Sequence, residues 1–297
     1  MIDRIKRKLL FRAEGIDTRI SKAFARAAAT AAARQIDPKN PISWEFAGFS
    51  QQGEDGVHDY LCTHLLKPNR WFFEIGSYDG LENCTTWFAT ARGYGGVMVE
   101  GNTRRAIRLQ RLVSTFLNVY AVHQMVNLDN IANLMKMCPM HNPDLFVIDI
   151  DSTDFHILKK VLELGYRPKI LTVEYNSAFG PDEPITIPYK AMFDRSAAHP
   201  TALYYGVSIA AWRKLLEPIG YQFLTVGSNG VNAFFANPAA FPEGFLAGVR
   251  GPEFLENFSD VNATTYPFFD TNGVRTMPER NWRKQFEQMK DMEFFRV

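Results

Sequence analysis

Acidic side chains recur where short apolar segments end, and this pattern suits the binding of a charged ligand. Each of four such segments finishes at or next to a carboxylate: residues 71–75, 96–100, 145–150 and 170–174. If these segments are parallel strands, their carboxyl ends meet at one edge of a sheet, where ligands bind in open α/β folds. The predicted edge carries Glu74, Asp79, Glu100, Asn102, Asp149, Asp151, Asp154, Glu174 and Asn176.

A glycine turn follows the first segment and has the pattern Glu-x-Gly-x-x-x-Gly over residues 74–80. Gly76 permits a sharp turn and lets a ligand approach the backbone closely. Glu100 ends the next segment, where an acid commonly accepts the two hydroxyls of a ribose. Together the turn and the acid predict a site for a nucleoside cofactor.

Charge indicates which nucleoside cofactor fits. A dinucleotide site needs the spacing Gly-x-Gly-x-x-Gly, so that amides can hold a pyrophosphate, and here the third glycine is misplaced. Glu74 and Asp79 would also repel phosphate. S-adenosylmethionine has no phosphate and carries a sulfonium and an ammonium group. We therefore expect S-adenosylmethionine, with Glu74 and Asp79 attracting its positive groups, and an NAD(P)-linked oxidoreductase as the alternative from the same fold class.

Four oxygen-bearing residues at the later strand ends could hold a metal ion. Carboxylate and amide oxygens suit a hard cation, Mg²⁺ or Ca²⁺, better than zinc. Such an ion would lower the pKa of an acceptor hydroxyl and orient it. The predicted ligands are Asp149, Asp151, Glu174 and Asn176.

Two further roles remain open for these acids. Without a metal, Asp149 or Asp151 would take the acceptor proton as general base, and His156 is a third candidate base. In the structural alternative the acids cap helices and bind water, as we expect for Asp154 at the start of a helix. The same alternative applies to Gln51, Glu54 and Asp55, which fit a helix N-terminus.

Strand and helix patterns alternate along residues 71–174. A third apolar segment covers 117–122, and helical stretches cover 104–114, 128–138 and 155–164. This alternation predicts a parallel sheet with helices on both faces. After residue 200 we expect a helix over 208–219 and two strands over 221–226 and 232–236. These two strands must pair antiparallel, because a parallel return needs a long crossover.

Composition excludes several classes of protein. The chain has 297 residues, 46% of them hydrophobic and 13% aromatic, so it must bury a large core. Its three cysteines have no zinc spacing and indicate a reducing compartment. No apolar run approaches 18 residues and no signal peptide is evident. We expect a soluble, cytoplasmic protein.

Charge is distributed unevenly. Residues 1–36 hold nine bases and three acids, net +6, which leaves 24 bases and 29 acids, net −5, in the remainder. An acidic body argues against nucleic-acid binding. The basic arm has apolar residues at helical spacing, which predicts an amphipathic helix. Three roles remain open for this helix: packing on its own body or a second subunit, contact with the inner face of an anionic membrane, or action as a transit peptide.

Several motifs, in the same order along residues 46–236, resemble those of FkbM-type S-adenosylmethionine-dependent methyltransferases. The chain departs from that family at Ser152 and Thr153, where the family usually has Gly-Asn. The motifs are Ser-Gln-Gln-Gly-Glu-Asp at 50–55, Phe-Glu-Ile-Gly-Ser-Tyr-Asp-Gly at 73–80, Gly-Val-Met-Val-Glu-Gly-Asn at 96–102, Phe-Val-Ile-Asp-Ile-Asp-Ser-Thr-Asp-Phe at 146–155, Arg-Pro-Lys-Ile-Leu-Thr-Val-Glu-Tyr-Asn at 167–176, Gly-Tyr at 220–221 and Asn-Ala-Phe-Phe at 232–235.

The resemblance implies a class I methyltransferase fold of seven strands that O-methylates a hydroxyl of a glycan or a related metabolite. It further implies that Gly76 and Ser77 face the methionine part of the donor, and Glu100 its ribose. Gln51, Glu54 and, less directly, Asn102 would line the same pocket.

The predicted organisation has three parts. Residues 1–40 form a basic helical arm, 41–240 the donor-binding domain, and 241–297 an extension packed on that domain. Residues 177–206 leave the carboxyl end of the fifth strand and are too long for a plain connection, so we expect them to form a wall for the acceptor. The alternative to an enzyme is an assembly protein that retains the fold and recruits partners through residues 1–36.

Overall fold

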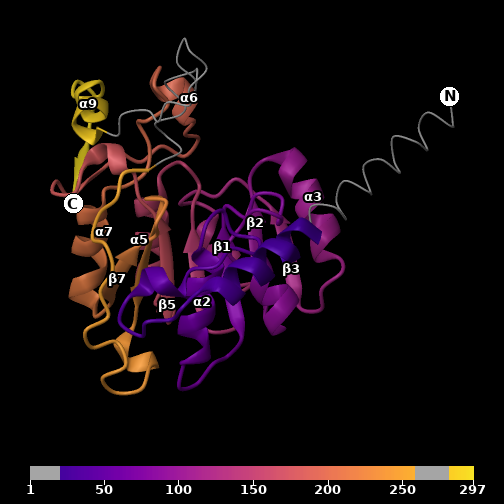
Figure 1. Ribbon diagram of the computed structural model, residues 1–297. Coiled ribbons are helices and arrows are strands. Elements are labelled where there is room, and N and C mark those ends of the chain that lie inside the picture. The colour runs from indigo at the N-terminus through magenta and orange to yellow at the C-terminus, as the bar shows by residue number, and fades with distance from the viewer. Residues whose placement is uncertain (1–20, 258–280) are drawn as a thin grey trace, which may run out of the picture.

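A seven-stranded sheet with the order β3-β2-β1-β4-β5-β8-β7 forms the centre of the computed structural model, which describes residues 21–257 and 281–297 (Figure 1). The first five strands pair in parallel, whereas β8 runs antiparallel to both β5 and β7. This confirms the predicted seven-stranded, mostly parallel sheet with an antiparallel terminal hairpin. The strands are β1 (Trp71–Ile75), β2 (Gly95–Glu100), β3 (Val119–His123), β4 (Leu145–Ile148), β5 (Ile170–Glu174), β7 (Gln222–Val226) and β8 (Asn232–Ala236).

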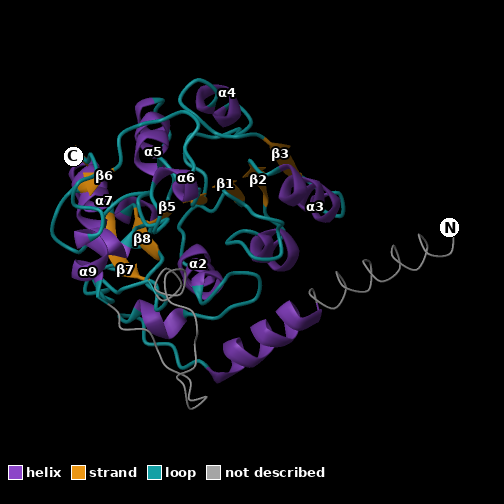
Figure 2. Ribbon diagram, turned by 90° about the horizontal axis from the view of Figure 1, so that it is seen from above, coloured by secondary structure: helices purple, strands orange, loops and turns teal. Residues whose placement is uncertain are grey.

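Helices cover both faces of the sheet because successive strand residues point to opposite faces and both sets are apolar (Figure 2). Phe73 and Phe146 belong to the core on one face, and Phe72 and Leu145 to the core on the other. The first core is closed by α4 (Ile131–Met135), α5 (Asp154–Glu163) and α7 (Ile209–Leu216), and the second by α2 (Glu54–Thr63) and α3 (Thr103–Val113).

The fourth strand is shorter than predicted, and this difference shapes the site. β4 ends at Ile148 rather than Ile150 because the Asp154 carboxylate accepts hydrogen bonds from the Ile150 and Ser152 amides, each at 3.0 Å. These bonds fold residues 149–153 into a turn at the head of α5. Asp154 thus has the structural role expected for it, and burial raises its pKa to about 6.

The segment after β5 is held by the end of the chain. Residues 177–206 contain η3 (Ser177–Phe179), β6 (Ile185–Thr186) and α6 (Arg195–Ala198). β6 pairs antiparallel with β9 (Phe295–Arg296), and α9 (Trp282–Glu287) packs near η3. Of the predicted extension 241–297, residues 281–297 therefore pack on the wall of the predicted acceptor site. Residues 241–257 contribute Phe241, Leu246 and Val249 to the second core, and 258–280 lie outside the described residues.

Residues 21–33 form a helix that rests on the body. Arg26 donates to the carbonyls of Ala47, Gly48 and Ser50, and Ala27 is buried. Residues 1–20, half of the predicted arm, lie outside the described residues. Within 21–257 and 281–297, we find no helix with the length and apolar character needed to cross a membrane.

Candidate functional site

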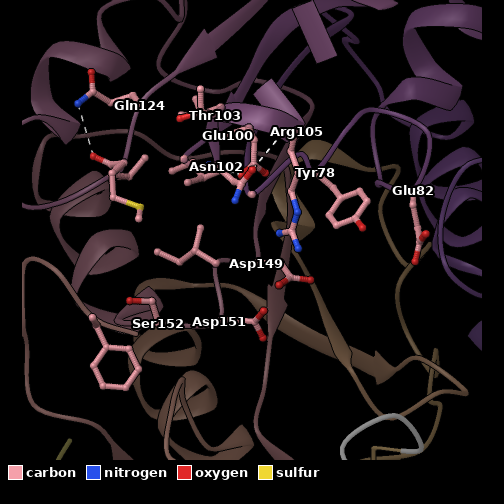
Figure 3. Close-up of a pocket in the computed structure, with 18 of the residues that line it drawn as sticks. Tyr78, Glu82, Glu100, Asn102, Thr103, Arg105, Gln124, Asp149, Asp151 and Ser152 are labelled. Carbon is pink, nitrogen blue, oxygen red and sulfur yellow. Dashed lines mark hydrogen bonds between the residues drawn. The ribbon is translucent and has the colours of Figure 1, made fainter. Parts of the chain in front are cut away.

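A cleft of about 540 Å³ opens at the carboxyl edge of the parallel strands (Figure 3). Loops after β1, β2, β3 and β4 form most of its lining, and Gln51 before α2 and residues 191 and 193 of the segment after β5 also contribute. Its volume lies within the range of small-molecule sites. The predicted site residues that line it are Gln51, Gly76, Glu100, Asn102, Asp149 and Asp151.

Gly76 makes the turn predicted for it. Its φ is +94°, and an added Cβ would lie 1.6 Å from the carbonyl oxygen of Asp149. The amides of Gly76 and Ser77 both donate to the Val99 carbonyl, at 2.9 and 3.0 Å. The turn after β1 is thus fixed against β2 on one side and the end of β4 on the other, and only glycine fits there.

Glu74 does not line the cleft, which corrects its assignment to the donor. The side chain is buried and holds the loop that follows the turn. One carboxylate oxygen accepts from the Cys84 amide at 2.8 Å, and the other from Asn83 Nδ2 at 2.5 Å and Thr85 Oγ1 at 2.6 Å. Burial raises the pKa of Glu74, and these bonds lower it. Its role is structural.

Ser77 and Asp79 are also buried beneath the cleft rather than in its lining. Ser77 Oγ donates to the Glu74 carbonyl at 3.3 Å, and Asp79 Oδ1 accepts from the Leu81 amide at 3.1 Å. Asp79 Oδ2 also lies 3.6 Å from an Arg108 nitrogen. The predicted contacts of these two side chains with the donor are therefore not supported; both shape the loop.

Glu100 and Asn102 lie at the end of β2, beside the turn (Figure 3). Glu100 Oε1 accepts from the Asn102 amide at 2.6 Å, which fixes the carboxylate at the cleft wall. Burial raises the pKa of Glu100, while the Asn102 amide and Arg105 lower it. The Asn102 side chain caps α3 by accepting from the Arg104 and Arg105 amides. Glu100 is thus placed for a ligand, whereas Asn102 chiefly positions the helix.

The segment before α2 contributes one residue to the cleft. Gln51 lines it, but Glu54 is buried away from it. The Glu54 carboxylate accepts from the Gln52 and Gly53 amides and from the side chains of Asn229 and Asn232. Glu54 thus links the N-terminus of α2 to the β7–β8 hairpin, as the structural alternative for this segment expects, and its assignment to the donor is corrected.

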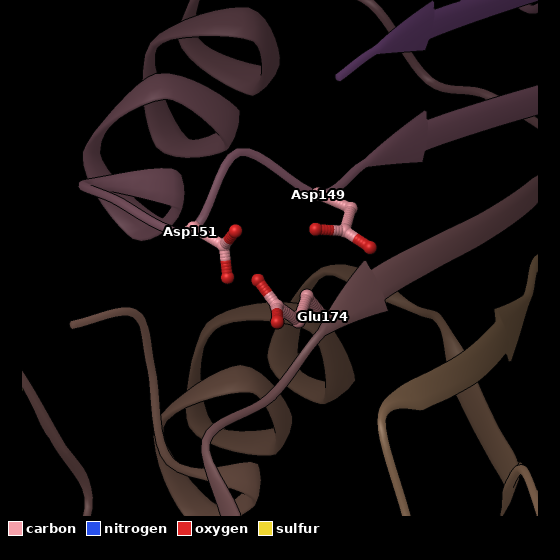
Figure 4. A group of neighbouring side chains, drawn as sticks. All are labelled: Asp149, Asp151 and Glu174. Carbon is pink, nitrogen blue, oxygen red and sulfur yellow. The ribbon is translucent and has the colours of Figure 1, made fainter. Parts of the chain in front are cut away.

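Three carboxylates converge at the ends of β4 and β5 (Figure 4). One oxygen from each of Asp149, Asp151 and Glu174 lies within 4.8 Å of the others. Burial, then the charge of Asp151, raises the pKa of Asp149 well above its usual value, and a hydrogen bond with Glu174 lowers it. Three ionised carboxylates at this spacing repel one another, so the cluster favours a shared proton or a bound cation.

Asn176 and His156 lie outside this cluster, which corrects both predictions. The Asn176 amide is fully used inside the loop: its oxygen accepts from the Ala178 amide, and its nitrogen donates to the Leu203 and Tyr205 carbonyls. His156 Nε2 lies 2.9 Å from the Ile187 carbonyl, so this nitrogen carries the proton, and burial lowers the pKa of the ring. Asn176 is therefore unsuited to ligate a metal, and His156 does not line the cleft.

Two arginines near the acids were not predicted. The guanidinium of Arg105 lies 4.1 Å from the centre of the Tyr78 ring and enters the cleft (Figure 3). Arg195 donates to Asp151 Oδ1 at 2.8 Å and stacks on Tyr205. The sequence signal for Arg105 is its place in the first helical turn after the acid of β2, and the sequence offered no comparable signal for Arg195.

Few of the aromatic rings in the wall after β5 are open to the cleft. Phe193 lines the cleft, but Tyr204 and Tyr205 are buried, and the Tyr189 hydroxyl accepts from the Leu128 amide at 2.9 Å. A ring available to stack on an acceptor is therefore Phe193.

No protein-family model matches the chain, and no curated protein matches it. Solved structures with a similar arrangement include an O-methyltransferase from Bacillus cereus in complex with S-adenosylhomocysteine, with 18% identity over 73% of this chain and 89% of that chain and a TM-score of 0.39. The O-methyltransferase TomG from Streptomyces achromogenes, in complex with S-adenosylmethionine, has 15% identity over 71% of this chain and 93% of that chain, with a TM-score of 0.41. A putative O-methyltransferase from Klebsiella pneumoniae has 15% identity over 73% of this chain and 87% of that chain, with a TM-score of 0.38.

Proposed function

We propose that this protein is an S-adenosylmethionine-dependent methyltransferase that transfers a methyl group to a hydroxyl. The observation that carries the proposal is that Gly76, Glu100 and Asp149, from three separate strand ends, border one cleft. A donor bound there supplies a methyl group on a positively charged sulfur. The FkbM-type resemblance adds a sugar or surface glycan as the proposed acceptor.

The charge of the cleft supports this donor over a dinucleotide. Four acids line it, and the Glu100 carboxylate is held by the Asn102 amide in a position suited to ribose hydroxyls. A pyrophosphate would meet repulsion from these acids, whereas a sulfonium and an ammonium group would be attracted. The close turn at Gly76 leaves the backbone accessible without a side chain above it.

The carboxylate cluster would act on the acceptor. The acceptor oxygen attacks the methyl carbon in line with the sulfur, the carbon–sulfur bond breaks, and the hydroxyl proton passes to Asp149. The three oxygens within 4.8 Å also suit a hard divalent cation held by Asp149, Asp151 and Glu174. Such a cation would lower the pKa of the acceptor hydroxyl. Phe193 would pack against an apolar sugar face.

Residues 1–36 have a separate proposed role at the inner face of a membrane or in self-association. Their net charge of +6 supports attraction to anionic lipid, and the helix over 21–33 packs on the body through Arg26. Co-sedimentation with phosphatidylglycerol vesicles, compared with phosphatidylcholine vesicles, tests the membrane contact. Size-exclusion chromatography with light scattering tests self-association.

Isothermal titration with S-adenosylhomocysteine, with and without Mg²⁺, tests the function. We expect the wild type to bind the ligand, and Asp149→Asn to lose the effect of Mg²⁺ while Glu163→Gln, an exposed change on α5, behaves as wild type. The absence of binding heat from the wild type under both conditions would contradict the proposal. Methyl transfer to a panel of sugars then identifies the acceptor.

A further inference from the structure

The described lining of the cleft contains a single cation, and it is surrounded by acids. Arg105 is its one lysine or arginine, against Glu82, Glu100, Asp149 and Asp151. An acidic cleft is suited to the positive groups of the proposed donor. That donor, however, also carries one negative group, the α-carboxylate of its methionine part, which the four acids would repel.

Arg105 is fixed above the turn that follows β1. It stands in the first turn of α3, where the Asn102 side chain accepts from its amide at 3.2 Å. Its guanidinium lies 4.1 Å from the centre of the Tyr78 ring, and Tyr78 directly follows Ser77, two residues after Gly76. The stacking holds the guanidinium beside the part of the cleft that the glycine turn borders (Figure 3).

The donor atoms of this guanidinium remain available to a ligand. Among residues 21–257 and 281–297, the Arg105 guanidinium makes no hydrogen bond or ion pair, and the residue is exposed. Arg108, one turn along α3, instead approaches Asp79, and Arg195 is bound to Asp151. The positive charge of Arg105 nevertheless interacts with carboxylates on both sides of the cleft, since it lowers the pKa of Glu100 and the pKa of Asp151.

We infer that Arg105 binds the α-carboxylate of the donor and so orients its methionine part along the turn at Gly76. This inference rests on the proposed function. A guanidinium presents two parallel N–H groups to a carboxylate, which fixes direction as well as position. It would thereby separate the negative end of the donor from the acids, which remain for the sulfonium and ammonium groups.

Two ligands that differ by one group test the inference. S-adenosylhomocysteine carries the α-carboxylate, and its decarboxylated analogue keeps the adenosine, the sulfur and the amine but lacks that group. Calorimetry measures the affinity of both for the wild type, Arg105→Gln, Arg105→Lys and Arg104→Gln. Arg104 is an exposed neighbour on α3 that does not line the cleft, so its variant matches the change in net charge.

We expect Arg105→Gln to lower the affinity for S-adenosylhomocysteine about tenfold or more. The affinity for the decarboxylated analogue should stay within about twofold of the wild-type value, or increase, because the substitution removes the repulsion between Arg105 and the amine of the ligand. Arg105→Lys should lose less affinity for S-adenosylhomocysteine than Arg105→Gln does. Arg104→Gln should bind both ligands with wild-type affinity. An equal loss for both ligands in Arg105→Gln, or no loss for either, would overturn the inference. If the wild type binds neither ligand, the proposed function itself fails.

Discussion

The carbonyl oxygen of Asp149 occupies the space that a side chain on Gly76 would need, 1.6 Å from the position of its Cβ. The turn after β1 and the end of β4 are thus in direct contact. Gly76 belongs to the proposed donor site, and Asp149 to the carboxylate cluster. The two halves of the proposed reaction therefore meet at one backbone contact.

This contact makes Gly76→Ala informative. Gly220 has nearly the same φ, +95° against +94°, and its Cβ would meet nothing within 4 Å. Gly220→Ala therefore isolates the cost of a positive φ, about 1–2 kcal/mol. We expect Gly76→Ala to lower the melting temperature more than Gly220→Ala and to weaken S-adenosylhomocysteine at least about tenfold, because the Asp149 carbonyl must move. Equal effects of the two variants, measured by thermal unfolding and calorimetry, would refute this account of the turn.

Glu74 should affect stability rather than chemistry. Glu74→Gln places an amide nitrogen where the carboxylate accepts from the Cys84 amide, Asn83 and Thr85. Because at least one buried donor then lacks a partner, we expect a loss of about 2 kcal/mol, measured by chemical denaturation. Glu163→Gln, on the exposed face of α5, is the control and should change little. An unchanged unfolding midpoint for Glu74→Gln would contradict the structural role.

The strands and their common edge could be predicted from the sequence, because buried parallel strands are continuous apolar runs that end in polar turns. β1, β5 and β8 match their predicted bounds, and Glu100 and Asp149 line the cleft as expected. Which acids face the cleft could not be predicted. Glu74 lies inside β1 and points into the fold, where the loop at 83–85 supplies its partners, and only the tertiary structure brings that loop back.

The same limit explains the errors at Asn176 and His156. Each follows an apolar segment or an acidic motif, as a site residue would, but it donates to backbone carbonyls of residues 187–205, a segment without a regular pattern. Arg105 and Arg195 were missed for a related reason. Basic residues on helices are usually exposed to solvent, and their direction depends on Tyr78 and Tyr205 beneath them.

His58 should control part of the stability in acid. Its ring is fully buried between Phe88 and Phe234, with Nε2 2.6 Å from Thr172 Oγ1, and burial lowers its pKa from 6.5 to about 3. Because the pKa of His58 is lower in the folded than in the unfolded state, its contribution to the free energy of unfolding is fully present above about pH 6.5. This contribution is lost as the pH falls toward 3. The full effect is on the order of 5 kcal/mol.

The difference in unfolding free energy between wild type and His58→Gln, measured from pH 4 to 8, checks this prediction. The difference is the proper quantity because Asp55 titrates in the opposite sense: burial raises its pKa to about 7, so its contribution is lost as pH rises. We expect the wild type to lose its relative advantage as pH falls. A difference that is independent of pH would show that His58 does not titrate on unfolding. His123→Gln, at an exposed site, is the control.

Removal of divalent ions separates the two proposed roles of the carboxylate cluster. If Asp149, Asp151 and Glu174 hold a cation, Mg²⁺ should raise the melting temperature of the wild type and EDTA should reverse the increase. Glu174→Gln should abolish the effect, and Glu183→Gln, at an exposed site after η3, should retain it. If Mg²⁺ does not change the melting temperature of the wild type, the cation role is contradicted. The role of Asp149 as proton acceptor then explains the cluster.

The central claim is that Gly76, Glu100 and Asp149 border a site for a positively charged methyl donor. Its most direct measurement is the calorimetric affinity of the wild type and Glu100→Ala for S-adenosylhomocysteine and for NAD⁺. We predict that the wild type binds S-adenosylhomocysteine and not NAD⁺, and that Glu100→Ala weakens the former at least about tenfold, as loss of hydrogen bonds to a ribose requires. Binding of NAD⁺ in preference, or an unchanged affinity of Glu100→Ala, would contradict the account.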